Sequence, residues 1–169
     1  MAAAIKAYVR YVDAVNRVVG RFAMYLIFAM MGILLYSSIT KTFFIPPLWT
    51  LEMAQFTMVA FYLLGGGLSL QLDSHVRMDL LYGRWSERTR AKVDAVTVLL
   101  LIFYLVFLIY GGISSTSYAL QYGEKSYSSW APQMAPIKII MTFGMVLMLL
   151  QAIATFFKSL ATARGETLP

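Results

Sequence analysis

The stretch FAMYLIFAMMGILLYSSIT, residues 22–40, contains no Asp, Glu, Lys, Arg or His. Three further charge-free runs follow it, at residues 53–72, 95–123 and 139–157. An α-helix rises about 1.5 Å per residue, so about 20 residues are needed to cross the roughly 30 Å hydrocarbon core of a bilayer. Each run can cross once, and the third is long enough to tilt or to extend beyond the membrane. The sequence therefore predicts one all-α integral membrane domain over residues 1–169, with four transmembrane helices near residues 22–40, 51–72, 93–120 and 137–157.

The composition favours lipid as the solvent for most of this chain. Hydrophobic residues make up 60% of the sequence and charged residues 13%, compared with about 45–50% and about 25% in ordinary soluble domains. The absence of cysteine excludes disulfides and thiolate metal sites, and the single histidine, His75, excludes sites that need paired imidazoles. We therefore expect no cofactor and no metal site. Basic residues flanking membrane spans explain the formal charge of +6 better than nucleic-acid binding does.

The distribution of basic residues predicts the orientation of the chain. Four crossings place both termini on the same side of the membrane. Eleven of the 14 Lys and Arg residues lie on that side: Lys6, Arg10, Arg17, Arg21, Arg77, Arg84, Arg88, Arg90, Lys92, Lys158 and Arg164. The opposite side carries Lys41, Lys125 and Lys138. Because short cytoplasmic segments are enriched in Lys and Arg, both termini are expected to be cytoplasmic.

The segment before the first run is amphipathic. Its apolar residues recur at spacings of three and four, at Ile5, Tyr8, Val12, Val15 and Val19. Its charged residues form another stripe, at Lys6, Arg10, Asp13, Arg17 and Arg21. One interpretation is an interfacial helix on the cytoplasmic membrane surface, with its basic face toward lipid phosphates; the other is a solvated face on a helix that packs on a partner protein. The run that follows is longer than the roughly 7–15 residues of a signal-peptide core, so we expect a retained first span.

Two outer loops carry aromatic residues that suit the membrane interface. Prolines at 46–47 break the chain after the first run, and Trp49 follows at the expected interface. Thr50 is a candidate N-cap, and Glu52 falls in the first helical turn, where a negative charge suits the positive end of the helix dipole. Trp130 lies in the second outer loop. Trp49, Glu52 and Trp130 are therefore candidate structural or partner-interface residues.

Glycines cluster late in the second run, at Gly65, Gly66 and Gly67. Small residues let helix backbones approach closely in lipid. Three consecutive glycines also weaken a helix, by about 1 kcal/mol each in water. We interpret them as a packing surface, within the protein or toward a partner, with an unwound substrate site as the alternative.

A polar cluster, DSHVRMD at residues 73–79, follows the second run. Arg77 can form a two-pronged contact with a carboxylate, and Asp79 is a local candidate. His75 is better explained as a hydrogen-bonded interfacial residue than as a metal ligand, because one histidine with scattered carboxylates is a weak metal signal. His75, Arg77 and Asp79 are candidate structural or partner-facing residues, and a solvated turn is the alternative for the whole cluster.

The four runs lack the groups that ion transport or catalysis needs. Ion pathways and proton relays use ionisable groups within the membrane. Here the nearest such residues lie at predicted helix ends: Lys41, Glu52, Asp73, Asp94 and Lys138. Serines at 114, 115 and 117 have no histidine nearby in the sequence to act as a base. We therefore expect no catalytic residues and no enzymatic activity.

The order of these motifs resembles a known family. Trp49-Thr50-Leu51-Glu52 opens the second span, a glycine-rich end closes it, and His75-Val76-Arg77-Met78-Asp79 follows. This pattern resembles the small membrane subunit of tripartite ATP-independent periplasmic (TRAP) transporters. The segments MDLLYGRWSERTRAKVDAV and YGEKSYSSWAPQMAPIKIIMTFGM look like one branch of that family. The resemblance covers essentially the whole chain.

The resemblance implies a complex in the bacterial inner membrane. In that family a periplasmic binding protein captures an organic acid, typically a carboxylate or 2-oxo acid, and a large membrane subunit moves it inward with sodium and without ATP. The large subunit works as an elevator, and the small subunit is expected to buttress it. The expected partners are therefore the large subunit, the binding protein and membrane lipids, with no nucleic acid.

Two other classes of function stay open from the residues alone. A stand-alone small oligomeric transporter or channel would need polar residues that meet within the bundle or across an oligomer. A membrane enzyme would need a catalytic constellation, which the sequence does not display.

Overall fold

The computed structural model describes residues 3–45, 47–72 and 87–163. Four helices account for most of them: α1 (Ala3–Phe43), α2 (Thr50–Gln71), α4 (Glu87–Tyr122) and α5 (Ala135–Ala163). Each is long and apolar enough to cross a membrane. In the described part of the chain there is no strand, only an isolated bridge between Lys125 and Gln133. The predicted all-helical class with four span-capable helices is confirmed, and each expected span falls on one helix, apart from Leu72 just beyond α2.

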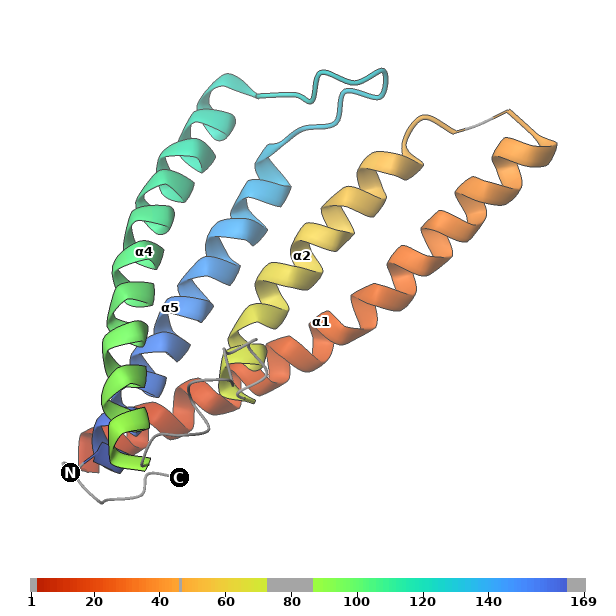
Figure 1. Ribbon diagram of the computed structural model, residues 1–169. Coiled ribbons are helices and arrows are strands. Elements are labelled where there is room, and N and C mark those ends of the chain that lie inside the picture. The colour runs from red at the N-terminus through yellow and green to blue at the C-terminus, as the bar shows by residue number, and fades with distance from the viewer. Residues whose placement is uncertain (1–2, 46, 73–86, 164–169) are drawn as a thin grey trace.

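The helices form an open layer and do not close into a bundle (Figure 1). At the loop end they lie in the order α4, α5, α2, α1, and neighbours in this order make the main helix contacts. Toward the other end the helices converge, and α1 crosses α5 as well as α2. The beginning of α1 and the end of α5 lie at this same end (Figure 1).

The N-terminal amphipathic segment is not a separate helix. It is the first part of α1, which continues without a break from Ala3 to Phe43. No proline interrupts these residues, and the only glycine near the junction, Gly20, has the Leu68 side chain where a Cβ would otherwise lie. A continuous helix keeps every backbone hydrogen bond within the chain, which is the favoured solution in lipid.

The apolar stripe of this segment packs inside the protein. Val9 and Val12 are buried in a cluster with Ala154, and Ile5, Tyr8, Leu150 and Phe157 pack around it. Val15 and Val19 pack on a second cluster, formed by Ala23, Ala60, Leu64 and Leu147. The face that the sequence made available to the membrane surface is thus used to join α1 to α5 and α2.

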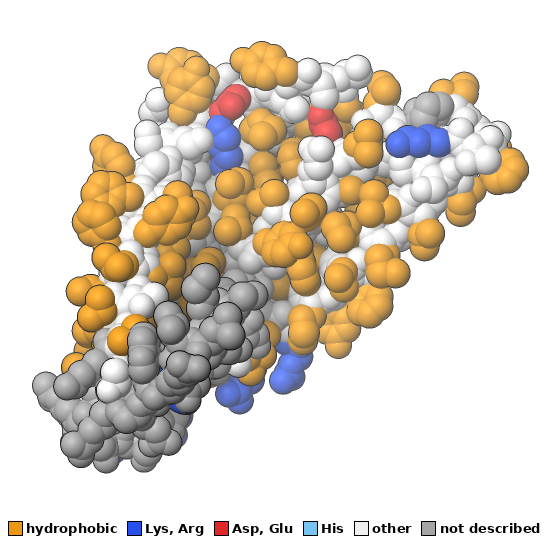
Figure 2. Space-filling model, in the orientation of Figure 1, with side chains coloured by type: hydrophobic (Ala, Val, Ile, Leu, Met, Phe, Trp, Pro, Cys, Tyr) orange, Lys and Arg blue, Asp and Glu red, His pale blue; other side chains and the backbone are white. Residues whose placement is uncertain are grey.

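Large apolar side chains remain exposed on every helix. They include Phe28 on α1, Tyr62 on α2, Phe107 on α4 and Phe143 on α5, each more than half exposed. Figure 2 shows hydrophobic side chains over the visible faces of the helices and the visible charged ones near the two ends. Such a surface requires lipid or another apolar partner around it.

Candidate functional site

Trp49 and Glu52 lie where α1 and α2 meet at the loop end. The Trp49 ring stacks on Tyr36 of α1, with 5.9 Å between ring centroids. Trp49, and not Thr50, occupies the N-cap position, and its side chain makes no capping hydrogen bond. Thr50 is fully buried, and its hydroxyl lies 3.0 Å from Ser37 Oγ and donates to the Pro47 carbonyl at 3.2 Å. The expected cap at Thr50 therefore serves instead as a link between α1 and α2.

The loop between α4 and α5 is held by two polar contacts. Lys138 of α5 forms an ion pair with Glu124, and Ser126 Oγ donates a hydrogen bond of 3.1 Å to Glu52 Oε1. Two backbone hydrogen bonds, Ser126 N–Pro132 O and Met134 N–Glu124 O, both 2.9 Å, fold the loop back on itself. Glu52 therefore connects the start of α2 to this loop, which is a role that its position in the first helical turn did not reveal.

Trp130 of this loop is 40% exposed and lines an apolar groove of about 480 Å³. Met53 and Phe56 of α2, Ile140 of α5 and Leu26 of α1 line the same groove. The structure thus brings Trp130 close to the outer part of α2, on which Glu52 also lies.

The three consecutive glycines continue the α2 helix and face three different surroundings. A Cβ on Gly67 would lie 2.2 Å from Asn16 Oδ1 of α1, and one on Gly66 would lie 2.7 Å from Met148 Sδ of α5. A Cβ on Gly65 would meet nothing within 4 Å. Two of the glycines thus permit helix contacts within the chain, whereas Gly65 lines an open groove between α1 and α2. In this structure the segment is not unwound.

Gly144 of α5 makes a closer contact that the sequence analysis did not single out. A Cβ there would lie 2.9 Å from the backbone carbon and oxygen of Leu63 on α2. Only a hydrogen atom fits between the two helices at this point, which is the typical use of small residues in membrane helix packing.

His75, Arg77 and Asp79 lie outside the described residues, as does the rest of the polar cluster at 73–79. Their structural or partner-facing role stays a prediction. Within residues 3–45, 47–72 and 87–163, no three His, Cys, Asp or Glu side chains form a group suited to a metal ion.

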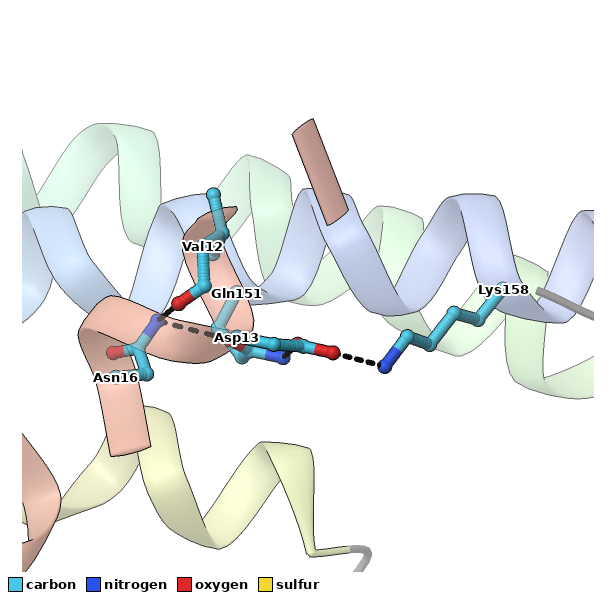
Figure 3. Close-up of polar contacts among 5 residues, drawn as sticks. All are labelled: Val12, Asp13, Asn16, Gln151 and Lys158. Carbon is cyan, nitrogen blue, oxygen red and sulfur yellow. Dashed lines mark hydrogen bonds and ion pairs between the residues drawn. The ribbon is translucent and has the colours of Figure 1, made fainter. Parts of the chain in front are cut away.

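The most extensive polar cluster among the described residues joins α1 to α5 (Figure 3). Asp13 Oδ2 accepts from Lys158 Nζ at 2.6 Å, and Asp13 Oδ1 accepts from Gln151 Nε2 at 2.8 Å. Asn16 Nδ2 donates to Gln151 Oε1 at 2.9 Å and to the Val12 carbonyl at 3.2 Å. Asn16 and Gln151 are fully buried. A buried amide pair of this kind holds two helices in a defined register, because any sliding leaves polar groups unpaired.

One atom of this polar cluster has no hydrogen-bond donor. Asn16 Oδ1 is buried without a partner and points into the space that a side chain on Gly67 would fill. The absence of a Cβ at Gly67 thus lets the α1 amide approach the α2 backbone. The sequence analysis missed Asn16 and Gln151 because it searched the spans for ionisable side chains, whereas uncharged amides were the available signal.

The sequence comparison addresses family membership. Residues 30–162 match the model of the family "Tripartite ATP-independent periplasmic transporters, DctQ component". The chain belongs to this family. The match covers well over half of the DctQ chain and includes parts of all four helices. A search of curated proteins finds no match.

Family membership confirms the resemblance to the small TRAP membrane subunit. DctQ is a transporter component and not an enzyme family, and a DctQ chain with four span-capable helices is a multi-pass inner-membrane protein. Trp49, Glu52, Trp130 and the three α2 glycines lie inside the matched region. Asp13 and Asn16 precede it, so half of the polar cluster in Figure 3 belongs to the part of α1 outside the match.

Proposed function

We propose that this DctQ component is a static scaffold for the large membrane subunit of a TRAP transporter. The large subunit would carry an organic acid, of the carboxylate or 2-oxo acid type, inward by an elevator movement coupled to sodium. A periplasmic binding protein would deliver the acid. The small subunit would give the moving part a fixed surface, and family membership supports this role as a transporter component.

The open layer of helices is the observation that carries the proposal. A closed four-helix bundle would bury a central core, whereas here apolar side chains stay exposed along α1, α2, α4 and α5. The charge-free runs at 22–40, 53–72, 95–123 and 139–157 bring no ionisable Asp, Glu, Lys, Arg or His side chain to mid-membrane depth. A broad apolar surface without a charged pathway suits a subunit that supports transport without lining the route.

Partner contacts are proposed at the residues whose surroundings stay open. Gly65 lines the groove between α1 and α2 and has room for a close helix approach. Trp130, on the pinned outer loop, presents an aromatic edge beside α2. We also assign His75, Arg77 and Asp79 to the partner-facing or structural set, on the sequence pattern alone.

Both termini are proposed to be cytoplasmic, on the excess of basic residues at that end. The chain lacks cysteine, so single reporter cysteines can test this. We expect Ser128→Cys, in the loop after α4, to react with a membrane-impermeant maleimide in intact cells. Thr162→Cys, at the exposed end of α5, should react only after permeabilisation. Labelling in the reverse pattern would overturn the orientation.

Co-purification tests the scaffold role. The chain carrying an affinity tag is coexpressed with the large TRAP membrane subunit encoded beside it, and the complex is washed in mild detergent. We expect the untagged large subunit to elute with the chain, because the exposed apolar surface needs a partner. An unrelated four-span protein with the same tag is the control. Elution of the large subunit with the control but not with the chain would remove the support for the proposal.

A further inference from the structure

The first part of α1 carries a second apolar stripe on its outward side. Tyr11, Val18, Phe22 and Tyr25 are 72%, 71%, 61% and 65% exposed. Their spacing, with exposed alanines at 7 and 14, follows helical turns and places them on one face. This face lies away from Val9, Val12 and Asn16, which are buried against the other helices. We call the set Ala7, Tyr11, Ala14, Val18, Phe22 and Tyr25 the outer stripe.

Basic side chains follow one edge of the outer stripe. Lys6, Arg10, Arg17 and Arg21 recur at helical spacing and are all exposed. The one carboxylate in their row, Asp13, is turned to Lys158 and Gln151 of α5. Among the described residues no carboxylate pairs with these four side chains; with its amide turned to suit its neighbours, Gln71 accepts from Arg17 Nη2 at 3.2 Å. Basic side chains also stand out along the lower edge of the molecule in Figure 2. The edge therefore carries a net positive charge.

The polar cluster of Figure 3 holds this face in one direction. Asp13 and Asn16 bind α5 from the inner side of α1, so the segment cannot roll to exchange its two faces without breaking those hydrogen bonds. The outer stripe is also continuous with the first span, because Phe22 and Tyr25 lie at the start of the charge-free run at 22–40. A surface that begins in lipid at its C-terminal end has lipid as its natural neighbour further along.

We propose that the outer stripe is a binding surface for the anionic phospholipids of the adjoining leaflet. Tyr11, Val18 and Phe22 would enter the boundary between headgroups and acyl chains, and Arg10, Arg17 and Arg21 would contact the phosphates. Aromatic side chains with a basic flank are typical of helices that lie at a membrane interface. Each basic residue near an anionic bilayer adds an attraction that a zwitterionic bilayer does not supply. The face involved differs from the Ile5–Val19 stripe, which is occupied by α5 and α2.

The test uses the full-length cysteine-free chain with a spin label at Val18→Cys. The chain is reconstituted in phosphatidylcholine vesicles and in an equimolar mixture with phosphatidylglycerol. Collisions of the label with oxygen, which concentrates in lipid, are compared with collisions with a water-soluble nickel chelate. A label at Val9→Cys, which is fully buried, is the matched control and should be shielded from both reagents.

We expect the label at position 18 to favour oxygen and to move deeper when phosphatidylglycerol is present. The combined variant R10Q/R17Q/R21Q should lose the phosphatidylglycerol-dependent shift. Its melting temperature should stay unchanged, because these side chains are exposed. Equal exposure of the label to the nickel chelate in both vesicles would overturn the proposal, as would a shift that persists in the triple variant.

A protein partner is the competing occupant of the outer stripe. Reconstitution together with the large subunit distinguishes it, because a protein contact would shield the label from oxygen and from the nickel chelate alike. Such shielding would overturn the lipid proposal, and retained oxygen contact would support it. The arm with the chain alone does not depend on the proposed scaffold role, so failure of one proposal can be told from failure of the other.

Discussion

Gly144→Ala should lower the stability of the isolated chain more than alanine at any glycine that faces open space. The added methyl group would lie 2.9 Å from the backbone carbon and oxygen of Leu63, and backbone atoms cannot rotate away as a side chain can. The α2 and α5 helices must therefore move apart, and their contact joins the two halves of the layer. Overpacking of this kind costs about 1–3 kcal/mol, at the upper end where backbone has to shift.

Gly111→Ala on the neighbouring helix α4 is the matched control. A Cβ there meets nothing within 4 Å, and alanine is a better helix former than glycine by about 1 kcal/mol in water. We expect the melting temperature in detergent to fall for Gly144→Ala and to stay equal or rise for Gly111→Ala. If both variants melt together with the wild type, the close contact between α2 and α5 does not exist in solution.

Gly67→Ala should be the second strongly destabilising change. Its methyl group would lie 2.2 Å from Asn16 Oδ1, and Asn16 cannot swing aside without breaking its bonds to Gln151 and to the Val12 carbonyl. Because Gln151 is fully buried, loss of that partner leaves an unpaired amide, at a cost of about 1–3 kcal/mol. Gly65→Ala, two positions away in the same helix, should leave the melting temperature equal or higher, since nothing lies within 4 Å of it.

A double-mutant cycle shows whether the clash with Asn16 is the cause. Asn16→Ala removes the amide that the new methyl group would strike, so adding Gly67→Ala to it should cost little more. The sum of the two single effects should exceed the effect of the double variant by about 0.5–3 kcal/mol. Additive effects would mean that Gly67 and Asn16 are not in contact, and the polar cluster of Figure 3 would then lack its support from α2.

The sequence was enough to predict the four helices, because each charge-free run has a length that only a membrane span explains. It also placed the glycines of α2 at helix contacts, although it could not say which of the three would face a neighbour. That distinction depends on the rotation of α2 relative to α1 and α5. The run of three glycines is compatible with several rotations, and only the structure selects Gly66 and Gly67.

The order of the helices and the use of α1 were beyond the sequence for a physical reason. Lipid chains are as apolar as leucine, so an apolar stripe such as Ile5–Val19 gains little by choosing lipid over another helix. The amphipathic pattern therefore predicted a helix but not its neighbour, and in the structure α5 and α2 take that place. Packing also turns the second exposed face, with Tyr11 and Val18, outward.

The polar cluster could have been anticipated in part. Gln151 interrupts the last charge-free run, and a buried amide in a membrane helix needs a partner. Its partner, Asn16, is separated from it by 135 positions and lies in a segment that seemed to belong to the membrane surface. Without the crossing of α1 over α5 there was no reason to pair the two amides.

The scaffold role depends most directly on one measurement, the melting temperature of the chain alone and in the purified complex with the large membrane subunit. A chain built as an open layer with exposed apolar faces should gain stability when a partner covers them. The account predicts that both subunits elute together and that the chain melts at a clearly higher temperature in the complex. A chain that elutes without the large subunit, or that melts at the same temperature with and without it, would contradict the account.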